Sequence, residues 1–557
     1  MKKKVFLILS FVLVSALVSG RAYAEERTSE KVDYLKMSEI LGRYSPGIYY
    51  SSLHEQYRRM DIPRPFSRTC RQIFSPPIKQ PVSETASTGA LSRTLLVVNS
   101  TLYASPPARE RIVRYAEDIQ RAYGCAVIVE AIEGGTAENI KALIQGYYAA
   151  GLDGVVLIGR LPVAWFEVPN DHYWWNGGYG YADWTIDLFY MDMDGLWEDR
   201  DHNGKYDTHT SGSGDIQPEL FVGRIDASTM TAYGNEVELF CAYMDKNHLY
   251  WTGQIRLPNY GLVYTDHDWA NEDASHFRHL YGTRNYEDTR WLDSSQNEVT
   301  KTDYLNQRLP DIFYGFIQIW THATYFAHDF YSGGSCTESE VRAMKPRALG
   351  FNIDGCHACD WAAGLGLRFL GGSYVFNESS TSLAVIGTTK VGGMLGFEAF
   401  YLSLGKNSCL GRAFCDWFTD RLNSNQEMGY ILGWHYGMTI VGDPLVTFVA
   451  VPGIDAASRD VEPPLSFFGA RQENRSLVLK ELINVLTWED NPQSLPGKTS
   501  GYRIYEAAPA SLIPLADVRL GNLKYWHRKV DDRPYRYALC AIDFDGRESP
   551  FTYTTVR

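Results

Sequence analysis

The stretch FNIDGCHACDW, residues 351–361, begins as an apolar run typical of a buried strand and ends abruptly in polar residues. Two cysteines, Cys356 and Cys359, and one histidine, His357, lie within four positions. Such a group could be half of a metal site, a disulfide, a redox pair, or a nucleophile with its surroundings. Which of these it is depends on the fold around the strand.

Apolar runs and helical patterns alternate on both sides of this stretch. Continuous apolar runs predict strands covered on both faces, and the alternation predicts parallel sheets. A second series of alternating strands and helices begins after a helix at 236–249, so we expect two α/β subdomains rather than one. The predicted strands are 94–98, 126–129, 154–158, 220–222, 260–265, 315–320, 349–354 and 383–388, and other predicted helices are 106–123, 136–150, 395–404 and 411–423.

The N-terminus has the pattern of a cleavable signal peptide, residues 1–24. Lys2 to Lys4 form a basic region, residues 5–18 an apolar core, and Ala22-Tyr23-Ala24 a cleavage signal. The core is short for a membrane anchor, and no second stretch long enough to span a bilayer follows. We therefore expect a protein that is secreted or held at the cell surface or in the periplasm of a bacterium-like cell.

Length and composition indicate several domains and exclude one class of partner. A chain of 557 residues with 45% hydrophobic content can bury several cores. The net charge of −13 argues against a nucleic-acid partner, because phosphate contacts require clustered Lys and Arg. The expected divisions are an N-terminal extension or pro-segment at 25–90, α/β subdomains at 91–252 and 253–455, and an all-β domain at 463–557; the oligomeric state is left open.

The all-β domain is predicted from short alternating strands. One strand ends at Trp488, a second spans Tyr502 to Tyr505, and a third begins at Tyr535. The pattern resembles a fibronectin type III module, which implies a β-sandwich.

A cysteine and a histidine follow directly on two predicted strands of the second subdomain. His322 follows the strand at 315–320, and Cys356 follows the strand at 349–354. Side chains just past the carboxyl ends of parallel strands line the ligand crevice, and neighbouring strands lie about 4.8 Å apart. A thiolate activated by an imidazole would be a nucleophile there, with the backbone amides of Ala323 and Cys356 placed to receive an oxyanion.

Other interpretations of these residues remain. Both could be ordinary strand-end residues. A structural zinc on Cys356, His357 and Cys359 would need more ligands, and no second C-x-x-C or H-x-x-x-H occurs. A Cys356–Cys359 redox pair lacks a thioredoxin-like context. The cysteine count is nine, so at least one thiol stays unpaired within the chain. An unpaired thiol in an exported protein is a liability unless it is buried or used, which makes a nucleophilic cysteine worth testing.

Five further segments follow one another along the chain: VVLIGRLP (155–162), IDLFYMDMDG (186–195), LFVGRIDAST (220–229), LAVIGTTK (383–390) and IVGDPL (440–445). In this order they resemble the gingipain family of secreted cysteine endopeptidases, which share the caspase-like fold. The resemblance runs from about 94 to 450.

The resemblance implies roles for particular residues. Cys356 would be the nucleophile, with Trp361 as the aromatic residue five positions later, and Cys359 the alternative if the strand ran three residues further. Asp187 matches an aspartate at the base of the S1 pocket in Arg-specific members, so cleavage after basic residues is expected if it faces that pocket; bracing a loop is the alternative. The family's G-H-G is here Thr321-His322-Ala323, and the Ala323 amide can serve if its φ is negative.

An acid is also needed to fix the tautomer of His322, and we expect Glu167 to be that residue. Separately, residues 199–207 read D-x-D-x-N-G-x-x-D, the first nine positions of a calcium loop. Position twelve is Thr210 rather than Glu, so a complete EF-hand is excluded, and a solvated acidic loop is the alternative to a structural Ca²⁺. The expected ligands are Asp199, Asp201, Asn203, Lys205 and Asp207.

The sequence thus predicts a caspase-like α/β protein, with mostly parallel sheets in two subdomains, followed by an all-β sandwich. Its predicted function is that of a secreted cysteine endopeptidase acting on protein or peptide substrates with a Cys–His dyad. The alternative is a catalytically inactive gingipain-like scaffold that binds cell-surface protein or glycan.

Overall fold

The computed structural model describes residues 46–60, 64–75, 91–174, 178–255, 259–283, 285–290, 299–311, 314–424, 426–449, 463–475, 480–491, 494, 499–508, 511–543 and 548–557. All of them belong to one compact unit, residues 45–557. The predicted signal peptide lies outside the described residues. Among the helices of the described residues, none is both long and apolar enough to cross a bilayer.

One mixed sheet of eleven strands runs through the α/β region, in the order β1-β3-β2-β4-β9-β18-β17-β16-β12-β10-β11. Neighbouring strands are parallel except in the pairs β1–β3 and β17–β18. The strands are β1 (Ser67–Phe74), β2 (Arg93–Asn99), β3 (Ala126–Glu133), β4 (Gly154–Ile158), β9 (Phe221–Ile225), β10 (Gly261–Thr265), β11 (Tyr286–Arg290), β12 (Phe316–Trp320), β16 (Gly350–Asp354), β17 (Ala384–Thr388) and β18 (Met438–Gly442).

The expectation of two separate sheets is wrong, because the two halves join into this one sheet. The join is the parallel contact of β9 with β18, which holds a single residue pair, Arg224 with Val441. Strand β18, which the sequence did not predict, therefore closes the gap between the halves. A second unpredicted strand, β1, comes from the presumed N-terminal extension and pairs with β3 along its whole length.

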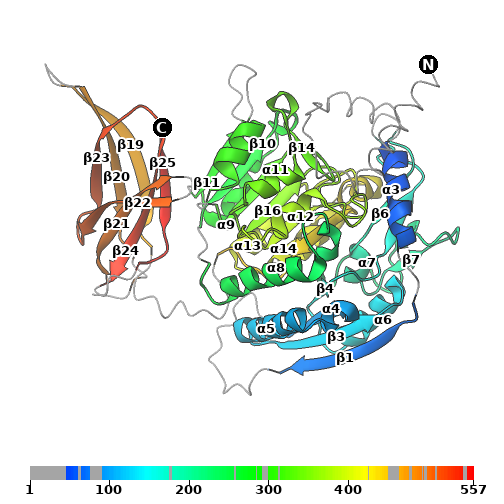
Figure 1. The fold of residues 1–557 in the computed structure, drawn as a ribbon. Coiled ribbons are helices and arrows are strands. Elements are labelled where there is room, and N and C mark those ends of the chain that lie inside the picture. The colour runs from blue at the N-terminus through cyan, green and yellow to red at the C-terminus, as the bar shows by residue number, and fades with distance from the viewer. Residues whose placement is uncertain are drawn as a thin grey trace, which may run out of the picture. The chain divides into compact units, whose positions relative to one another are not determined.

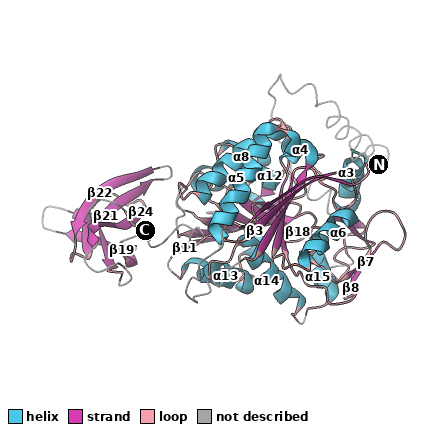
Figure 2. Cartoon of the chain, turned by 90° about the horizontal axis from the view of Figure 1, so that it is seen from below, coloured by secondary structure: helices cyan, strands magenta, loops and turns pink. Residues whose placement is uncertain are grey.

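Helices cover both faces of the sheet (Figure 2). Helices α5 and α8 lie together on one side, and α13 and α14 lie together on the other. The sequence explains α5 well: it has Pro at its start, Gly124 with φ 62° just after its end, and buried Ile112, Tyr115 and Ile119 at helical spacing. The main helices are α5 (Pro106–Tyr123), α6 (Ala137–Tyr148), α8 (Glu236–Trp251), α13 (Glu398–Gly405) and α14 (Leu410–Leu422).

The remaining helices and short strands of the α/β region lie outside the eleven-stranded sheet. Helix α3 lies alongside β6 (Figure 1). The helical elements are α3 (Pro46–Met60), α4 (Ser100–Ala104), α7 (Leu188–Met191), η1 (Ala227–Met230), η2 (His267–Trp269), η3 (Ala274–Phe277), α9 (Arg278–Tyr281), α10 (Lys301–Asp303), η4 (Tyr304–Arg308), η5 (Tyr331–Gly333), α11 (Glu338–Ala343), α12 (Leu370–Val375) and α15 (Met428–His435). The short strands are β5 (Trp165–Val168), β6 (Ala182–Thr185), β7 (Leu196–Glu198), β8 (Thr208–Thr210), β13 (His322–Thr324), β14 (Ala327–Asp329) and β15 (Ser335–Thr337).

The C-terminal region is a β-sandwich, as the sequence predicted. Sheets of the orders β19-β20-β23 and β22-β21-β24-β25 enclose a core that includes Trp488, Tyr502 and Leu539. The more specific likeness to a fibronectin type III module stays a prediction. The strands are β19 (Leu465–Arg475), β20 (Lys480–Glu489), β21 (Thr499–Ala508), β22 (Ser511–Arg519), β23 (Lys524–Val530), β24 (Tyr535–Asp543) and β25 (Thr552–Val556).

Candidate active site

The register between β12 and β16 brings the predicted cysteine and histidine to equivalent positions. The two strands are parallel neighbours, and Trp320 at the end of β12 pairs with Asp354 at the end of β16. His322 and Cys356 each lie two positions beyond these partners. The Thr321 amide donates to the Asp354 carbonyl oxygen at 3.3 Å, so the chains stay adjacent past the last paired residues.

Gly355 permits this close approach. A Cβ atom at this position would lie 2.8 Å from both the Ala323 Cβ and the Thr321 carbonyl oxygen. The Ala323 amide nitrogen would be 3.6 Å from that Cβ, which places it beside the residue that precedes Cys356. Ala323 is not among the residues with positive φ, so the backbone condition for replacing the family's glycine is met.

An aspartate that the sequence analysis missed holds His322. The Nε2 atom of His322 lies 2.8 Å from Asp268 Oδ2, and the edge of its ring meets Trp269 at 4.5 Å between ring centroids. Partial burial opposes ionisation of Asp268, but hydrogen bonds from His322 and His267 lower its pKa. A signal for Asp268 exists: it lies three positions beyond β10, the strand that pairs with β12 on its other side.

The structure places Glu167 elsewhere. Its carboxylate accepts hydrogen bonds from Tyr181, at 2.5 Å, and from the Asn203 side chain, at 2.8 Å. The expectation that Glu167 orients His322 is therefore corrected: the carboxylate that contacts this imidazole belongs to Asp268.

Cys356 is partly buried at the end of β16. Burial raises the pKa of its thiol, while a hydrogen bond from the Gly392 amide and the nearby charge of Lys390 act in the opposite direction. The Lys390 ammonium is itself buried and lies 2.8 Å from Asp171 Oδ2. No hydrogen bond joins Cys356 to His322, so a base must take the thiol proton in a rearranged or substrate-bound state.

Cys359 differs from Cys356 in its surroundings. It is fully buried, and its sulfur would lie 2.7 Å from a Cβ atom on either Gly371 or Gly387. Burial raises the pKa of this thiol as well. All nine cysteines are free, so Cys356 and Cys359 form no disulfide.

Helix α3 packs against the residues that follow Cys356. The ring of Tyr50 stacks on His357, with 3.4 Å between ring centroids. His54, which is fully buried, lies 2.9 Å from Asp183 Oδ1 and 3.0 Å from Asp360 Oδ2. Part of the predicted extension therefore covers one side of the candidate site.

Asp187 does not face an open pocket. It is buried, its Oδ1 lies 2.5 Å from Arg224 Nη2, and its Oδ2 accepts a hydrogen bond from Thr439 at 2.8 Å. Arg224 also lies over the ring of buried Trp361, at 5.1 Å from the centroid. Asp187 and Trp361 thus brace the seam between β9 and β18, which corrects the expectation that they contact substrate.

The predicted calcium loop lies between β7 and β8. One carboxylate oxygen each of Asp199, Asp201 and Asp207 lies within 4.8 Å of the others. The Gly204 and Asn203 amides donate to Asp199, which curls the loop as its glycine pattern predicts. The Lys205 ammonium points away from this group, toward Asp183 and Glu167.

In this α/β fold a cysteine and a histidine occupy equivalent positions beyond two neighbouring parallel strands, a placement that would suit a cysteine nucleophile and its base. The sequence model of peptidase family C25 matches residues 118–447, more than half of the chain. The chain belongs to this family, the gingipain family of cysteine peptidases.

Comparisons with single proteins give weaker likenesses. No curated protein matches the chain. A solved structure described as a protease is 13% identical, and the match covers 84% of this chain and 97% of that one with a TM-score of 0.45. A fibronectin-like protein from Clostridium thermocellum is 14% identical over 18% of this chain and 93% of its own, with a TM-score of 0.14.

Proposed function

We propose that this protein is an exported cysteine endopeptidase. Cys356 is the nucleophile, His322 the general base and acid, and Asp268 the residue that positions His322. The observation that carries the proposal is the β12–β16 register, which puts the thiol and the imidazole at equivalent positions past two paired strands. Export is supported by the basic and apolar N-terminal pattern and its Ala-x-Ala signal.

The reaction follows from these positions. His322 takes the Cys356 proton, and the thiolate attacks the carbonyl carbon of the scissile peptide bond. The negative charge moves to the carbonyl oxygen, which the amides of Ala323 and Cys356 stabilise. His322 then gives its proton to the leaving amine. A water molecule deprotonated by His322 hydrolyses the thioester and restores the thiol.

Asp268 has a defined part in this scheme. Its carboxylate accepts a hydrogen bond from Nε2 of His322, which leaves Nδ1 as the basic nitrogen. When His322 becomes an imidazolium, the same carboxylate stabilises its charge. Since the Cys356 thiol is held back from ionisation by burial, this assistance to the base matters.

Substitution of the two cysteines tests the assignment. Cys356→Ala should abolish hydrolysis across a panel of peptide substrates, with the fold intact. Cys359→Ala is the matched control, since it removes a buried thiol three positions away and should leave hydrolysis measurable. Full activity in Cys356→Ala would refute the proposal, and activity lost only in Cys359→Ala would shift the nucleophile to that residue.

We also propose that the loop at 199–207 holds a structural Ca²⁺, through Asp199, Asp201, Asn203, Asp207 and the Lys205 carbonyl. The alternation of oxygen ligands and the proximity of the three carboxylates support it. Titration of the chelator-treated chain with Ca²⁺ should raise its unfolding temperature, and Asp201→Asn should weaken that effect. An unchanged unfolding temperature in the wild type would exclude the ion.

A second function has one observation in its favour. Among the described residues no hydrogen bond joins Cys356 to His322, and burial raises the pKa of the Cys356 thiol, which suits a catalytically inactive scaffold that binds protein or glycan. Such a scaffold would hydrolyse no peptide in the panel, and its Cys356→Ala variant would behave as the wild type does.

A further inference from the structure

Of the histidine nitrogens that are buried without a hydrogen-bond partner among the described residues, two belong to histidines one helical turn apart, away from the candidate active site. They are Nδ1 of His276, in η3, and Nε2 of His279, in α9. An unsatisfied buried polar atom is destabilising, and it is uncommon enough in native proteins to need an explanation. Two such atoms one helical turn apart point to a ligand between them.

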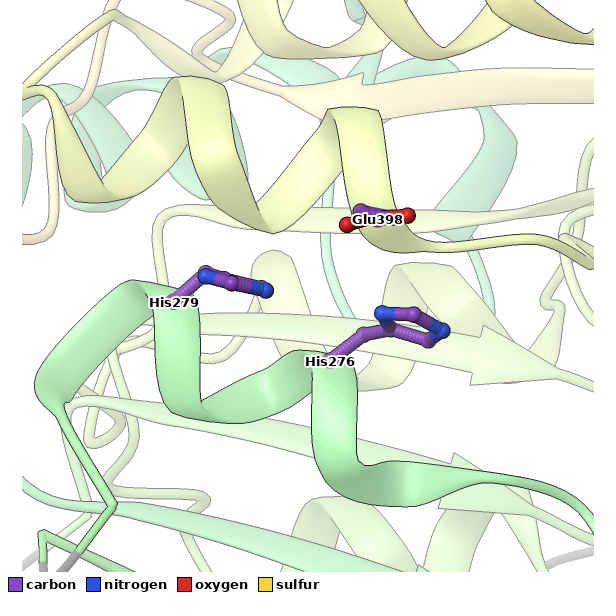
Figure 3. A group of neighbouring side chains, drawn as sticks. All are labelled: His276, His279 and Glu398. Carbon is purple, nitrogen blue, oxygen red and sulfur yellow. The ribbon is translucent and has the colours of Figure 1, made fainter.

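A carboxylate completes the group. Glu398 is the first residue of α13, and one of its oxygens lies within 4.8 Å of a ring nitrogen of each histidine. Figure 3 shows the two histidines side by side on their helical turns, with Glu398 facing them from the neighbouring helix. The Glu398 side chain is exposed, so it can shift to close around an ion at little cost.

We propose that His276, His279 and Glu398 bind one Zn²⁺ ion. Two imidazole nitrogens and one carboxylate oxygen suit zinc, whereas Ca²⁺ and Mg²⁺ prefer oxygen ligands throughout. Tetrahedral zinc with bonds near 2.0–2.1 Å needs ligand atoms about 3.3 Å apart, which small side-chain movements supply. Water takes the fourth position, on the exposed side of Glu398.

The surroundings of His276 agree with this assignment. The nitrogen that lacks a partner is Nδ1, while Nε2 lies 3.7 Å from Asp273 Oδ2. Histidines that bind a metal through one nitrogen commonly direct the other N–H toward a carboxylate, which fixes the tautomer. Asp273 is placed to do this once Nδ1 holds the ion.

The ion would join two segments that reach the candidate active site. His276 and His279 belong to the segment after β10, which also contains Asp268, the partner of His322. Glu398 begins the helix after the loop that contains Gly392, whose backbone amide lowers the pKa of the Cys356 thiol against the effect of burial. Zinc would therefore hold the segment after β10 and the loop before α13 in fixed positions relative to each other. This consequence rests on the proposed peptidase function, whereas the metal site itself does not.

Zinc binding by the full chain is the test. After treatment with a chelator, the protein is dialysed against Zn²⁺ in the presence of excess Ca²⁺, and bound zinc is counted by mass spectrometry. We expect one ion per chain, and a Co²⁺-loaded sample should show the absorption of a tetrahedral centre. Glu398→Gln and the double variant His276→Gln/His279→Gln should weaken zinc binding at least about 100-fold. Loss of a residue that supports a metal ligand can weaken binding by about this factor, and loss of the ligand itself should weaken it at least as much.

Glu427→Gln, an exposed glutamate just before α15, is the matched control and should bind zinc as the wild type does. Because Glu398 is exposed, its variant should fold even if the double variant does not. No zinc uptake by the wild type, or equal uptake by Glu398→Gln and the wild type, would overturn the proposal. Zinc uptake by a chain that hydrolyses no peptide would support the proposed metal site and refute only the proposed peptidase function.

Discussion

Cys356 and His322 occupy equivalent positions because of where two strands end. Each residue follows directly on an apolar run, so the rule that polar side chains gather at the carboxyl ends of parallel strands was enough to select both from the sequence. The same rule missed Asp268, because it lies three positions past its strand, within a short helical turn. Asp187 was misassigned because its partner, Arg224, lies 37 positions away and comes near only in the folded chain.

Asp268 should matter for catalysis and little for stability. Asp268→Asn replaces the carboxylate by a neutral amide, which can hold the wrong tautomer of His322 and does not stabilise the imidazolium. We expect kcat/KM to fall on the order of 100-fold or more, with an altered pH profile and an unchanged unfolding temperature. Asp532→Asn, at an exposed carboxylate in the sandwich, is the control. Equal kinetics in the two variants would remove Asp268 from the mechanism.

Asp187 should behave in the opposite way. Asp187→Asn leaves the Arg224 guanidinium buried without its counter-charge, and the loss of one partner of a buried ion pair costs about 3–5 kcal/mol. We expect a large drop in the free energy of unfolding, measured in denaturant, and an unchanged preference for the residue before the cleaved bond. A stable variant with a lost preference for Arg or Lys would restore Asp187 as a specificity residue.

At the scale of elements, the strands and helices of the α/β region follow the sequence closely. Continuous apolar runs became β2, β4, β12, β16 and β17 within about one residue of the predicted bounds. Strand β1 was missed because it is an exposed edge strand, and its polar sequence SRTCRQIF lacks an apolar run. Strand β18, MTIVG, was also not predicted, although all five of its residues are buried as in a strand covered on both faces.

The approach of β12 and β16 should depend on Gly355. In Gly355→Ala the added methyl group would meet the Thr321 carbonyl oxygen and the Ala323 side chain at 2.8 Å, which forces the strand ends apart. We expect hydrolysis to fall at least about tenfold, because small misplacements of reacting groups are costly. Gly146→Ala, in α6, is the control: no atom lies within 4 Å of its Cβ, and the variant should be slightly more stable. If both variants hydrolyse peptides as fast as the wild type, the close approach has no catalytic role.

At the scale of the whole molecule, local patterns could not show how the parts join. The two α/β halves share one sheet because β9 meets β18, a pairing between residues 224 and 441. Nor could the weak periodicity of 25–90 show that α3 packs on His357 or that β1 extends the main sheet. These contacts depend on tertiary packing between distant segments, and they make parts of the presumed extension integral to the fold.

The docking of α3 should weaken at alkaline pH. Burial lowers the pKa of His54, but the carboxylates of Asp360 and Asp183 outweigh it and raise the pKa to about 9. A raised histidine pKa contributes stability that is fully present below about pH 6.5 and is lost as the pH rises to about 9, on the order of 3 kcal/mol. Hydrogen exchange of residues 46–60, corrected for the intrinsic rate, should therefore be faster at pH 9.5 than at pH 6.

Helix α5, which contains no histidine, is the internal control for that experiment. Its protection should change less than that of α3 over the same range. Equal protection of α3 at both pH values would show that the charge on His54 does not hold the helix in place.

Cys356 should react as a nucleophile that His322 activates. A peptide carrying a thiol-directed electrophile can test this, with the labelled residue mapped by mass spectrometry. We expect rapid modification of Cys356 at neutral pH, slower modification of the partly buried Cys70 and Cys241, and loss of the rapid phase in His322→Ala. Rapid labelling of a different cysteine, or labelling of Cys356 at the same rate in His322→Ala, would contradict it.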